Sequence, residues 1–508
     1  MSCTTEYRNV ARIPLSEIPM MSMESFRTEL QRRVADGGLV LSFFGVPSQS
    51  DTDIFCATGN PETGKLSVCR TRVGDEYPAL TPDIPQLHWF ERELAEQWAI
   101  RPVGHPWLKP IRFMQKAYNG RNLFAPNGEP VQVGVTDYYS VAGKEIHEVA
   151  VGPVHAGIIE PGHFRFQCYG ETVFHLEIEL GYQHRGIEKA LVGGPNRRTP
   201  FFMETLAGDS SIAHGIAYAQ LMESLTGKSA PKRAKYIAAI ALELERLANH
   251  TGDLGALAGD IGYLPTLSYN GRLRGDYLNM TGLLCGNRFG RNLVTPGGVT
   301  VDLSADTVSE LKRRLETIFK ETRNSVDLLW ATPSVMARFE NTGVVKREDG
   351  VALGWVGPAA RACGIGLDAR AHFPFGAYED ISMPAATHAN GDVYARARIR
   401  WLEMKNARTF IDTALADLPA GPARAEIDMS GTDKPARDTL VVSLTEGWRG
   451  VVCHTAITDG NGRFAAYKVV DPSFHNWFAL AMSLRDEQIS DFPLCNKSFN
   501  LSYCGHDL

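Results

Sequence analysis

The chain has 508 residues, of which 44% are hydrophobic and 22% are charged, and its formal net charge at pH 7 is −6. These values are typical of a soluble globular protein with two or three domains. The sequence has no basic stripe, which argues against binding of nucleic acid. It has no apolar run of about 18 residues and no signal-peptide core at its N-terminus. We therefore expect a cytoplasmic chain that can dock on a membrane complex without crossing the membrane.

Residues 1–116 are predicted to form a small α/β domain. Amphipathic segments predict two helices, and three segments that alternate or run apolar predict strands. The helices are expected at 24–34 and 89–98, and the strands at 39–46, 53–58 and 65–72. Residues 117–150 are rich in glycine and asparagine and are interpreted as a linker with one strand at 130–135.

Residues 151–214 combine strand-forming residues with five histidines. Alternation over residues 163–168 and 172–180 predicts a hairpin around Tyr169-Gly170-Glu171. Polar groups among apolar residues need hydrogen-bonding partners when they are buried. The pattern alone leaves two interpretations open, a functional wall and a polar surface loop.

Helices dominate the remainder, which gives an α+β fold: a small α/β domain followed by a mainly helical domain, residues 151–508, with peripheral strands. The helices are expected at 210–225, 231–250, 277–289, 305–330, 392–416 and 474–484, with a strand and turn at 342–356 and antiparallel strands at 439–444, 451–458 and 463–470. On helix 231–250, Glu243, Arg246 and His250 share one side. They form either a solvated face with an ion pair or a polar relay.

The nine cysteines include no CxxC pair. A disulfide framework is not expected in a large chain without an export signal, and most of these side chains are predicted to be small buried hydrophobes. The nine are Cys3, Cys56, Cys69, Cys168, Cys285, Cys363, Cys453, Cys495 and Cys504.

Longer motifs cover most of the chain: GPVH, GYQHRGIEK, AHGIAYA, ELERLANH, PGGV, GPAARACGIGLDAR, GDVYARARIRWLEM and EGWRGVVCH…DGNGRFAAYKVVDPSF. Residues 151–508 resemble the hydrogenase-like subunit of respiratory complex I, which is homologous to the large subunit of nickel–iron hydrogenases. Residues 88–113 resemble the end of the small peripheral-arm subunit of complex I. The fused form is most similar to the large subunits of formate hydrogenlyase and related energy-converting (group 4) hydrogenases.

The resemblance to hydrogenases implies a nickel–iron centre held by two CxxC pairs. The first pair falls on Ala207 and Ser210, and the second on Ser502 and Gly505. Alanine, serine and glycine cannot replace the soft thiolates that such a metal centre requires. Cys504 is one position away from a ligand position. We therefore predict that the chain binds no metal and carries no cofactor of its own.

The resemblance to complex I implies a quinone site in the same place. His155 matches the first histidine of the family's loop, and Asp260 matches the acidic partner of the head-group histidine. The head-group histidine itself aligns with Ile159, although His163 can reach the same space. The family's tyrosine is replaced by Gly208. His155, His163 and Asp260 are thus candidate catalytic residues, but ordinary quinone reduction is not supported.

The resemblance also implies a neighbouring [4Fe–4S] cluster in a partner subunit. Arg185 occupies the family's position beside that cluster, with His184 next to it. A cation near a cluster stabilises its reduced form and raises its potential. The alternative is that His184 and Arg185 cap a helix or pair with Glu188. Glu160 resembles a hydrogenase glutamate near a structural magnesium.

Three functions follow as hypotheses. The first is a metal-free subunit of a membrane-associated oxidoreductase complex, on the cytoplasmic side of the cell membrane. It would pack against an iron–sulfur small subunit and couple electron transfer to ion-translocating membrane subunits. The second is a reductase of quinone or another small acceptor with a rearranged site, in which Tyr503, His506 and Asp507 supply new groups. The third is a non-catalytic scaffold.

Overall fold

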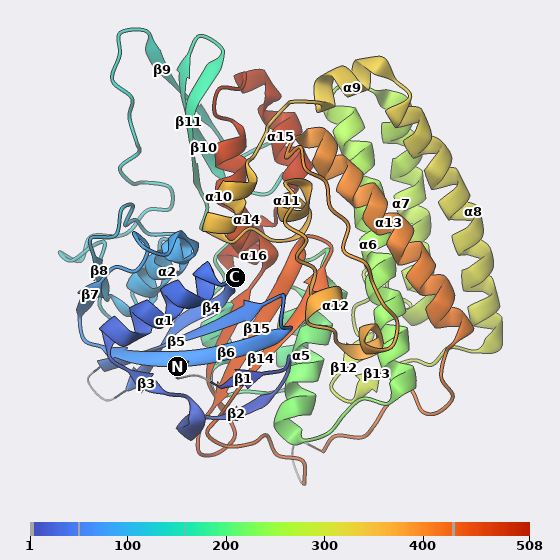
Figure 1. The fold of residues 1–508 in the computed structure, drawn as a ribbon, viewed down its shortest axis with the longest axis horizontal. Coiled ribbons are helices and arrows are strands. Elements are labelled where there is room, and N and C mark those ends of the chain that lie inside the picture. The colour runs from blue at the N-terminus through green and yellow to red at the C-terminus, as the bar shows by residue number, and fades with distance from the viewer. Residues whose placement is uncertain (1–4, 49–50, 158, 429–431) are drawn as a thin grey trace.

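The computed structural model describes residues 5–48, 51–157, 159–428 and 432–508. Helices and strands occur in separate groups along the chain, which confirms the α+β class. Figure 1 shows the sheets on one side and a layer of long helices on the other. Cys3 lies outside the described residues, and the other cysteines are free thiols. Among the helices of the described ranges, none is long and apolar enough to cross a membrane.

The N-terminal region is a five-stranded sheet with one helix packed on it. Its strands are β1 (Glu6–Tyr7), β3 (Met20–Met21), β4 (Leu39–Ser48), β5 (Asp51–Asn60) and β6 (Lys65–Val73), and the helix is α1 (Met23–Ala35). Phe26 and Leu30 of α1 are completely buried, and Ser22 caps the helix by accepting the N–H of Ser25. α2 (His88–Trp98) follows. The two helices and three strands predicted here are confirmed.

A second sheet joins the two ends of the chain. Its order is β16 (Phe464–Val470), β15 (Gly450–Thr458), β14 (Thr439–Gly447) and β2 (Arg12–Pro14), all antiparallel. Buried Lys468 on β16 also donates to Glu93 on α2 at 2.6 Å and to Glu188 at 2.9 Å. Residues 1–116 and 151–508 therefore share a sheet and a buried ion pair. Their assignment to two domains, with a linker at 117–150, stays a prediction.

The predicted hairpin is present as β10 (His163–Tyr169) and β11 (Thr172–Glu179), and β9 (Ile146–Val151) pairs with the outer side of β10. The strand predicted at 130–135 is wrong, because these residues lie in an extended loop. The side-chain amide of Gln115 forms hydrogen bonds with both backbone polar groups of Val131. It accepts the N–H at 3.2 Å and donates to the carbonyl at 2.5 Å. A side chain thus replaces the strand partner that the apolar pattern suggested.

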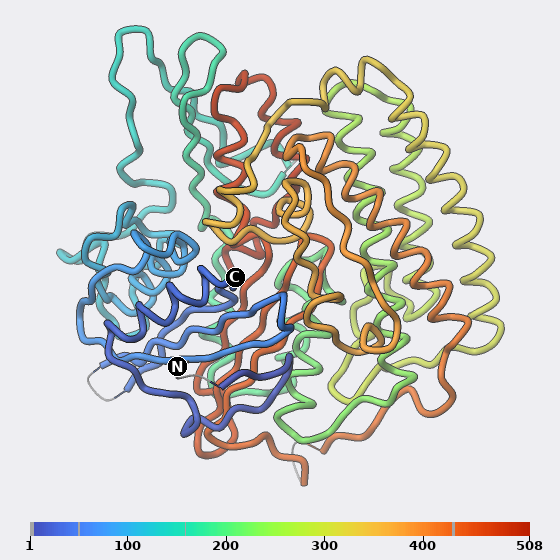
Figure 2. The backbone as a smooth tube through the Cα atoms, viewed as in Figure 1, coloured from blue at the N-terminus to red at the C-terminus, as the bar shows by residue number. Residues whose placement is uncertain are grey.

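The long helices are α5 (Ser211–Thr226), α6 (Lys232–Asp260), α7 (Leu264–Cys285), α8 (Ala305–Trp330) and α13 (Val393–Ala416). Four of them, α6, α7, α8 and α13, pack together on one side of the molecule, and α5 packs against β14 (Figures 1 and 2). The helix predicted at 277–289 is wrong in its bounds, because α7 continues through Gly271 and Gly275. Gly255 explains how α6 and α7 approach closely: a Cβ there would lie 2.8 Å from the Cβ of Asn270. Such packing overrides the weak helix propensity of glycine.

The strand and turn predicted at 342–356 are also wrong, since the segment contains the short helix α10 (Arg347–Leu353). Glu348 and Asp349 in its first turn favour the positive end of the helix dipole. Gly354 ends the helix in a left-handed conformation, with φ of 71°. The apolar residues that suggested a strand lie in the last turn of this helix and in the loops around it.

The other short elements connect these layers. The helices are α3 (Ile187–Leu191), α4 (Thr199–Glu204), α9 (Pro333–Phe339), α11 (Gly357–Ala362), α12 (Ala369–His372), α14 (Pro472–Ser483), α15 (Phe492–Phe499) and α16 (Tyr503–Asp507). The 3-10 turns are η1 (Leu15–Glu17), η2 (Pro85–Leu87), η3 (Gly376–Glu379) and η4 (Ile489–Asp491), and the short strands are β7 (Glu76–Pro78), β8 (Arg101–Val103), β12 (Val294–Thr295) and β13 (Gly298–Val299).

Candidate functional site

Residues 207–210 and 502–505 contain the four positions that the resemblance to hydrogenases assigns to nickel ligands, and we call them the ligand-equivalent segments. Ala207, Ser210 and Ser502 are buried. Ser502 is occupied as the N-cap of α16, where its hydroxyl accepts the N–H of Gly505 at 2.9 Å. No metal could take this hydroxyl without loosening the start of that helix.

Gly505 has no room for a side chain. A Cβ at this position would lie 2.7 Å from Cγ of Asp471, closer than real Cβ atoms approach other atoms. The carboxylate of Asp471 thus fills the space that a cysteine side chain at position 505 would need. Gly208 differs, because a Cβ there would meet only Nη2 of Arg291, at 3.8 Å.

Arg449 ties the first ligand-equivalent segment to the residues just before the second. Its Nη atoms bind both carboxylate oxygens of Asp209, at 2.6 and 2.9 Å, and its Nε donates to the carbonyl of Asn500 at 2.5 Å. Trp448 adds a second tie, since its indole N–H donates to the carbonyl of Asp209 at 3.0 Å. Asp209 stands between two ligand-equivalent positions, so this segment carries a carboxylate paired with arginine where hydrogenases carry metal ligands.

The structure places Arg185 at the edge of the same segments. Its guanidinium donates to the carbonyls of Thr205 at 2.7 Å, Leu206 at 3.0 Å and Cys504 at 3.2 Å. Arg185 is exposed and makes no ion pair with a carboxylate in the part of the chain that the structure describes. It does not pair with Glu188, which instead binds Lys468.

The turn that holds His184 and Arg185 is fixed by the C-terminal residues. Asp507 accepts the N–H groups of Gly181 at 2.8 Å and Gln183 at 2.9 Å, and its carbonyl lies 2.8 Å from Nδ1 of His184. His506 is buried and lies 3.0 Å from Asp507. His506 and Asp507, considered above as new groups for an acceptor, therefore anchor this turn, and buried Tyr503 packs against Trp477.

The loop histidines bind the backbone of their own loop. Nε2 of His155 lies 2.8 Å from the carbonyl of Gly162, and Nδ1 of His163 lies 3.4 Å from the carbonyl of Gly152. Burial lowers the pKa of His163, which favours the neutral imidazole. Asp260 is exposed at the end of α6. No hydrogen bond or ion pair joins Asp260 to either histidine among the residues described.

Cys504 is the one cysteine within a ligand-equivalent segment. Burial and the nearby carboxylate of Glu160 raise the pKa of its thiol to about 11. A single thiol cannot supply the four thiolates that a nickel–iron centre requires. Within the described ranges no three His, Cys, Asp or Glu side chains gather as a metal site would require. The residues present do not fit a nickel–iron centre.

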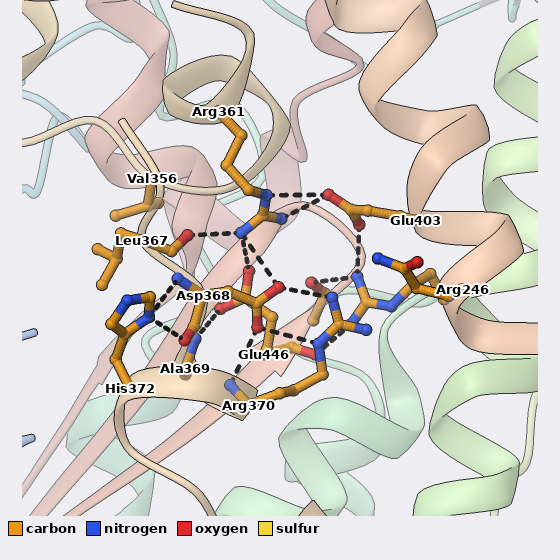
Figure 3. A network of polar contacts seen from close by, with 12 residues as sticks. Arg246, Val356, Arg361, Leu367, Asp368, Ala369, Arg370, His372, Glu403 and Glu446 are labelled. Atoms are coloured by element: carbon orange, nitrogen blue, oxygen red, sulfur yellow. Dashed lines mark hydrogen bonds and ion pairs between the residues drawn. The ribbon is translucent and has the colours of Figure 1, made fainter. Parts of the chain in front are cut away.

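A second polar region lies inside the molecule, between α6, α11, α13 and β14, and we call it the buried network (Figure 3). Glu243, Arg246 and His250 belong to it and are completely buried, which excludes the interpretation of a solvated face. The network consists of Glu243, Arg246, His250, Arg361, Asp368, Arg370, Glu403 and Glu446.

Glu403 of α13 is at the centre of the buried network. It binds Arg361 at 2.7 Å, Arg246 at 3.1 Å and Nε2 of His250 at 3.0 Å. The charge of Arg361 and the hydrogen bond from His250 hold the pKa of Glu403 well below its usual value despite burial. Burial lowers the pKa of His250 to about 4, so its ring is neutral at pH 7 and donates one N–H to Glu403.

Arg370 connects the other half of the buried network. It binds Asp368 at 2.6 Å and both oxygens of Glu243, at 3.0 and 3.1 Å. Arg361 reaches across to Glu446 at 2.9 Å, and the N–H of Ala369 donates to the same carboxyl at 2.8 Å. The charges are thus held by other charged groups rather than by water.

A chain of four buried side chains runs from β16 to the ligand-equivalent segments. The hydroxyl of Tyr467 lies 2.8 Å from Nδ1 of His454, Nε2 of His454 lies 2.9 Å from Nδ1 of His214, and Nε2 of His214 lies 3.2 Å from Asp471. With Asp471 ionised, one set of tautomers satisfies every bond: each group donates to the next one toward Asp471. The chain therefore orients the carboxylate beneath Gly505.

Sequence reasoning did not identify His214, His454, Asp471, Glu403 or Glu446 as site residues. All five lie inside the motifs AHGIAYA, EGWRGVVCH, VVDPSF and GDVYARARIRWLEM. The sequence does contain one signal for these residues: each is a charged or imidazole side chain flanked on both sides by residues of a buried strand or helix. Such residues need partners from elsewhere in the chain, and the sequence does not state which residues those are.

Comparisons with known proteins agree with this architecture. Residues 260–440 match the family described as "Respiratory-chain NADH dehydrogenase, 49 Kd subunit". The chain is 31% identical over 445 residues to formate hydrogenlyase subunit 5 of Escherichia coli, covering 84% of this chain and 76% of that protein. It is 29% identical over 371 residues to NADH-quinone oxidoreductase subunit 4 of Thermus thermophilus, covering 68% of this chain and 90% of that protein.

A third relative is the membrane-bound hydrogenase subunit alpha of Pyrococcus furiosus, which is 28% identical over 369 residues, covering 70% of this chain and 85% of that protein. The relatives thus include both hydrogenase subunits and NADH–quinone oxidoreductase subunits, and the similarity extends over most of each chain. The chain belongs to the family of large subunits shared by complex I and the energy-converting (group 4) hydrogenases.

Proposed function

We propose that this chain is a subunit of a membrane-associated, complex I-like oxidoreductase complex and that it works without a nickel–iron centre. The observation that carries this proposal is the filling of the ligand-equivalent segments. Asp471 occupies the space at Gly505, Ser502 caps a helix, and Asp209 is paired with Arg449. These segments contain one thiol, that of Cys504, where a nickel–iron centre needs four.

In this proposal the electron acceptor lies in a partner. A small subunit with a [4Fe–4S] cluster would pack beside Arg185 and His184. The exposed guanidinium of Arg185, bound only to carbonyl oxygens, supports this arrangement, because it is a positive charge without a carboxylate partner among the described residues. Such a charge favours the reduced cluster.

The proposed output is ion translocation by membrane subunits of the complex, with this chain peripheral on the cytoplasmic side. The printed names of two relatives, an NADH-quinone oxidoreductase subunit and a membrane-bound hydrogenase subunit, support a complex of this kind. The buried network supplies a set of charges that can respond to electron arrival. No specific observation favours the alternative of a quinone reductase, because His155 and His163 bind their own loop and Asp260 is separate from both.

Metal analysis of the native complex tests the absence of nickel. We expect iron and sulfide from the partner subunit and no stoichiometric nickel. One nickel atom per chain would overturn the proposal, and so would purification of the intact complex without an iron–sulfur subunit.

Arg185 provides a test of the cluster-side role. Arg185→Met in the intact complex is expected to lower the midpoint potential of the neighbouring [4Fe–4S] cluster, and Arg185→Lys is expected to restore part of the shift. The potential would be followed by electron paramagnetic resonance during a redox titration. If neither substitution changed the potential or the turnover of the complex, a purely structural scaffold would be the better description.

A further inference from the structure

The buried network contains one more carboxyl group than it has positive charges. The cations are Arg246, Arg361 and Arg370, and the carboxyl groups are those of Glu243, Asp368, Glu403 and Glu446. His250 does not balance the count, because its ring is neutral at pH 7. With every carboxyl ionised, the network would carry an uncompensated negative charge in a site closed to water. Such a charge is costly, and a buried carboxyl avoids the cost by keeping its proton.

The contacts indicate which carboxyl is the least compensated. Glu403 binds two arginines and a histidine N–H, Glu243 binds two arginines and the hydroxyl of Tyr378, and Asp368 binds Arg370 through both oxygens. The carboxyl of Glu446 on β14 accepts hydrogen bonds only from Arg361 and from one backbone N–H. It shares that arginine with Asp368, whose oxygen lies 3.6 Å from the same Nη1 atom.

The electrostatics of the site agree with this reading of the geometry. Burial, followed by the negative charge of Asp368, raises the pKa of Glu446 to about 7, although Arg361, Arg370 and Arg246 act in the opposite direction. The arginines hold the pKa of Asp368 at about 2. The two carboxyls are a coupled pair that shares one proton near neutral pH, with the proton on Glu446.

The turn that carries Glu446 also reaches the ligand-equivalent segments. Four consecutive residues take part: the carboxyl of Glu446 lies in the buried network, and the carbonyls of Glu446 and Gly447 accept from Arg246 at 2.7 and 3.1 Å. Trp448 and Arg449 then bind Asp209. The edge of the His250 ring also faces Trp448, at 6.1 Å between centroids.

We propose that Glu446 is a proton-exchange site of the buried network, and that the turn Glu446–Arg449 ties release of its proton to the charge at the ligand-equivalent segments. The step is a simple ionisation: the O–H bond of Glu446 breaks, the carboxylate keeps the electron pair, and the proton leaves to solvent water. The site itself is a property of this chain. Its role in coupling rests on the proposed function, since it needs an electron to arrive beside Arg185.

Infrared spectroscopy of the full chain tests the exchange site directly. Burial also raises the pKa of Glu179 to about 7 and that of Glu245 to about 8, so the comparison is the difference between the wild type and Glu446→Gln. We expect this difference spectrum to contain the carbonyl band of one protonated carboxylic acid that disappears with a midpoint near pH 7. Glu310→Gln is the matched control, because Glu310 is ionised and lies outside the buried network on α8, so the titrating band should remain. A titrating band that persists unchanged in Glu446→Gln overturns the proposal.

Asp368→Asn provides a second variant that keeps the test valid if Glu446→Gln does not fold. Removing the negative charge of Asp368 should move the titration of the Glu446 band to lower pH, because one cause of the raised pKa is gone. A band that does not move contradicts the shared proton.

The coupling role is tested separately in the native complex. The midpoint potential of the partner cluster is expected to depend on pH around neutrality, and Glu446→Gln is expected to remove that dependence. A potential that depends on pH equally in both proteins would overturn the link through the turn, even with the infrared band confirmed. Loss of the band in a complex that has no cluster would instead leave the exchange site standing and refute the proposed function.

Discussion

The ligand-equivalent segments and the buried network are joined by one short turn, yet they are held in opposite ways. At the edge of the segments Arg185 binds only backbone carbonyls, and a single arginine–carboxylate pair, Arg449 with Asp209, adds to them. In the buried network each charge depends on other charged side chains. Removal of Arg185 would therefore leave only carbonyl groups without this partner, whereas removal of a charged member of the network would leave a buried charge unpaired.

The largest effect is expected from breaking the buried network at Arg361. Arg361→Met would leave Glu403 and Glu446 without a cation that both of them bind. Because an unpaired buried charge is costly, we expect the free energy of unfolding to fall by about 3–5 kcal/mol. Urea unfolding followed by circular dichroism would measure the loss.

Arg313→Met is the matched control for this prediction. Arg313 makes an exposed ion pair with Glu310 on α8, at 2.8 Å. Exposed pairs of this kind contribute at most about 1 kcal/mol. Equal losses in the two variants would contradict the view that the buried network depends on mutual pairing.

The second prediction concerns acid and His250. Burial lowers the pKa of His250 to about 4, and its pKa in the unfolded chain is about 6.5. Between these two pKa values the imidazole binds a proton in the unfolded state but not in the folded state. The free energy of unfolding therefore decreases as the pH falls from about 6.5 to about 4. The full loss for this group is about 3 kcal/mol.

His250→Gln removes this titration and keeps an N–H donor toward Glu403. We expect the variant to lose less stability than the wild type over that pH interval, as measured by urea unfolding at several pH values. Parallel pH profiles would show that His250 is not buried in its neutral form.

Periodicity predicted most of the fold, and its failures have local causes. The helix at 305–330 has the predicted bounds, because a strong apolar stripe runs between a serine cap and the final tryptophan. The strand expected at 130–135 is absent because the side chain of Gln115 forms the hydrogen bonds of the Val131 backbone that a neighbouring strand would otherwise form. The strand at 342–356 failed because an acidic first turn and Gly354 favour a short helix. Both failures depend on residues outside the apolar pattern.

The candidate site was less predictable than the fold. The absence of thiols at the four ligand positions is visible in the sequence, as is the side shared by Glu243, Arg246 and His250. The partners of these residues are not visible, because Arg361 and Glu403 lie more than a hundred residues further along the chain. The role of Asp471 is equally hidden, since only the structure shows that it fills the space at Gly505.

The third prediction compares two glycines of the ligand-equivalent segments. Gly505→Ala would place a methyl group against Asp471, and overpacking of this kind costs about 1–3 kcal/mol. Gly208→Ala meets only one atom, at 3.8 Å, and should leave the free energy of unfolding unchanged within about 0.5 kcal/mol. Thermal unfolding of both variants checks the contrast. A destabilised Gly208→Ala would mean that the space beside Gly208 is filled.

The smallest change in stability is expected for Arg185→Met. Arg185 is exposed and donates only to carbonyl oxygens, and each such bond contributes about 1 kcal/mol or less when water can replace it. The carbonyls of Thr205, Leu206 and Cys504 would be hydrated in the variant, so we expect a loss of about 1 kcal/mol by urea unfolding. Arg449→Met offers the comparison, because Arg449 is buried and pairs with Asp209 through both Nη atoms. If Arg185→Met cost as much as Arg449→Met, Arg185 would be part of the structural framework, and its exposed guanidinium would no longer support a role beside a partner's cluster.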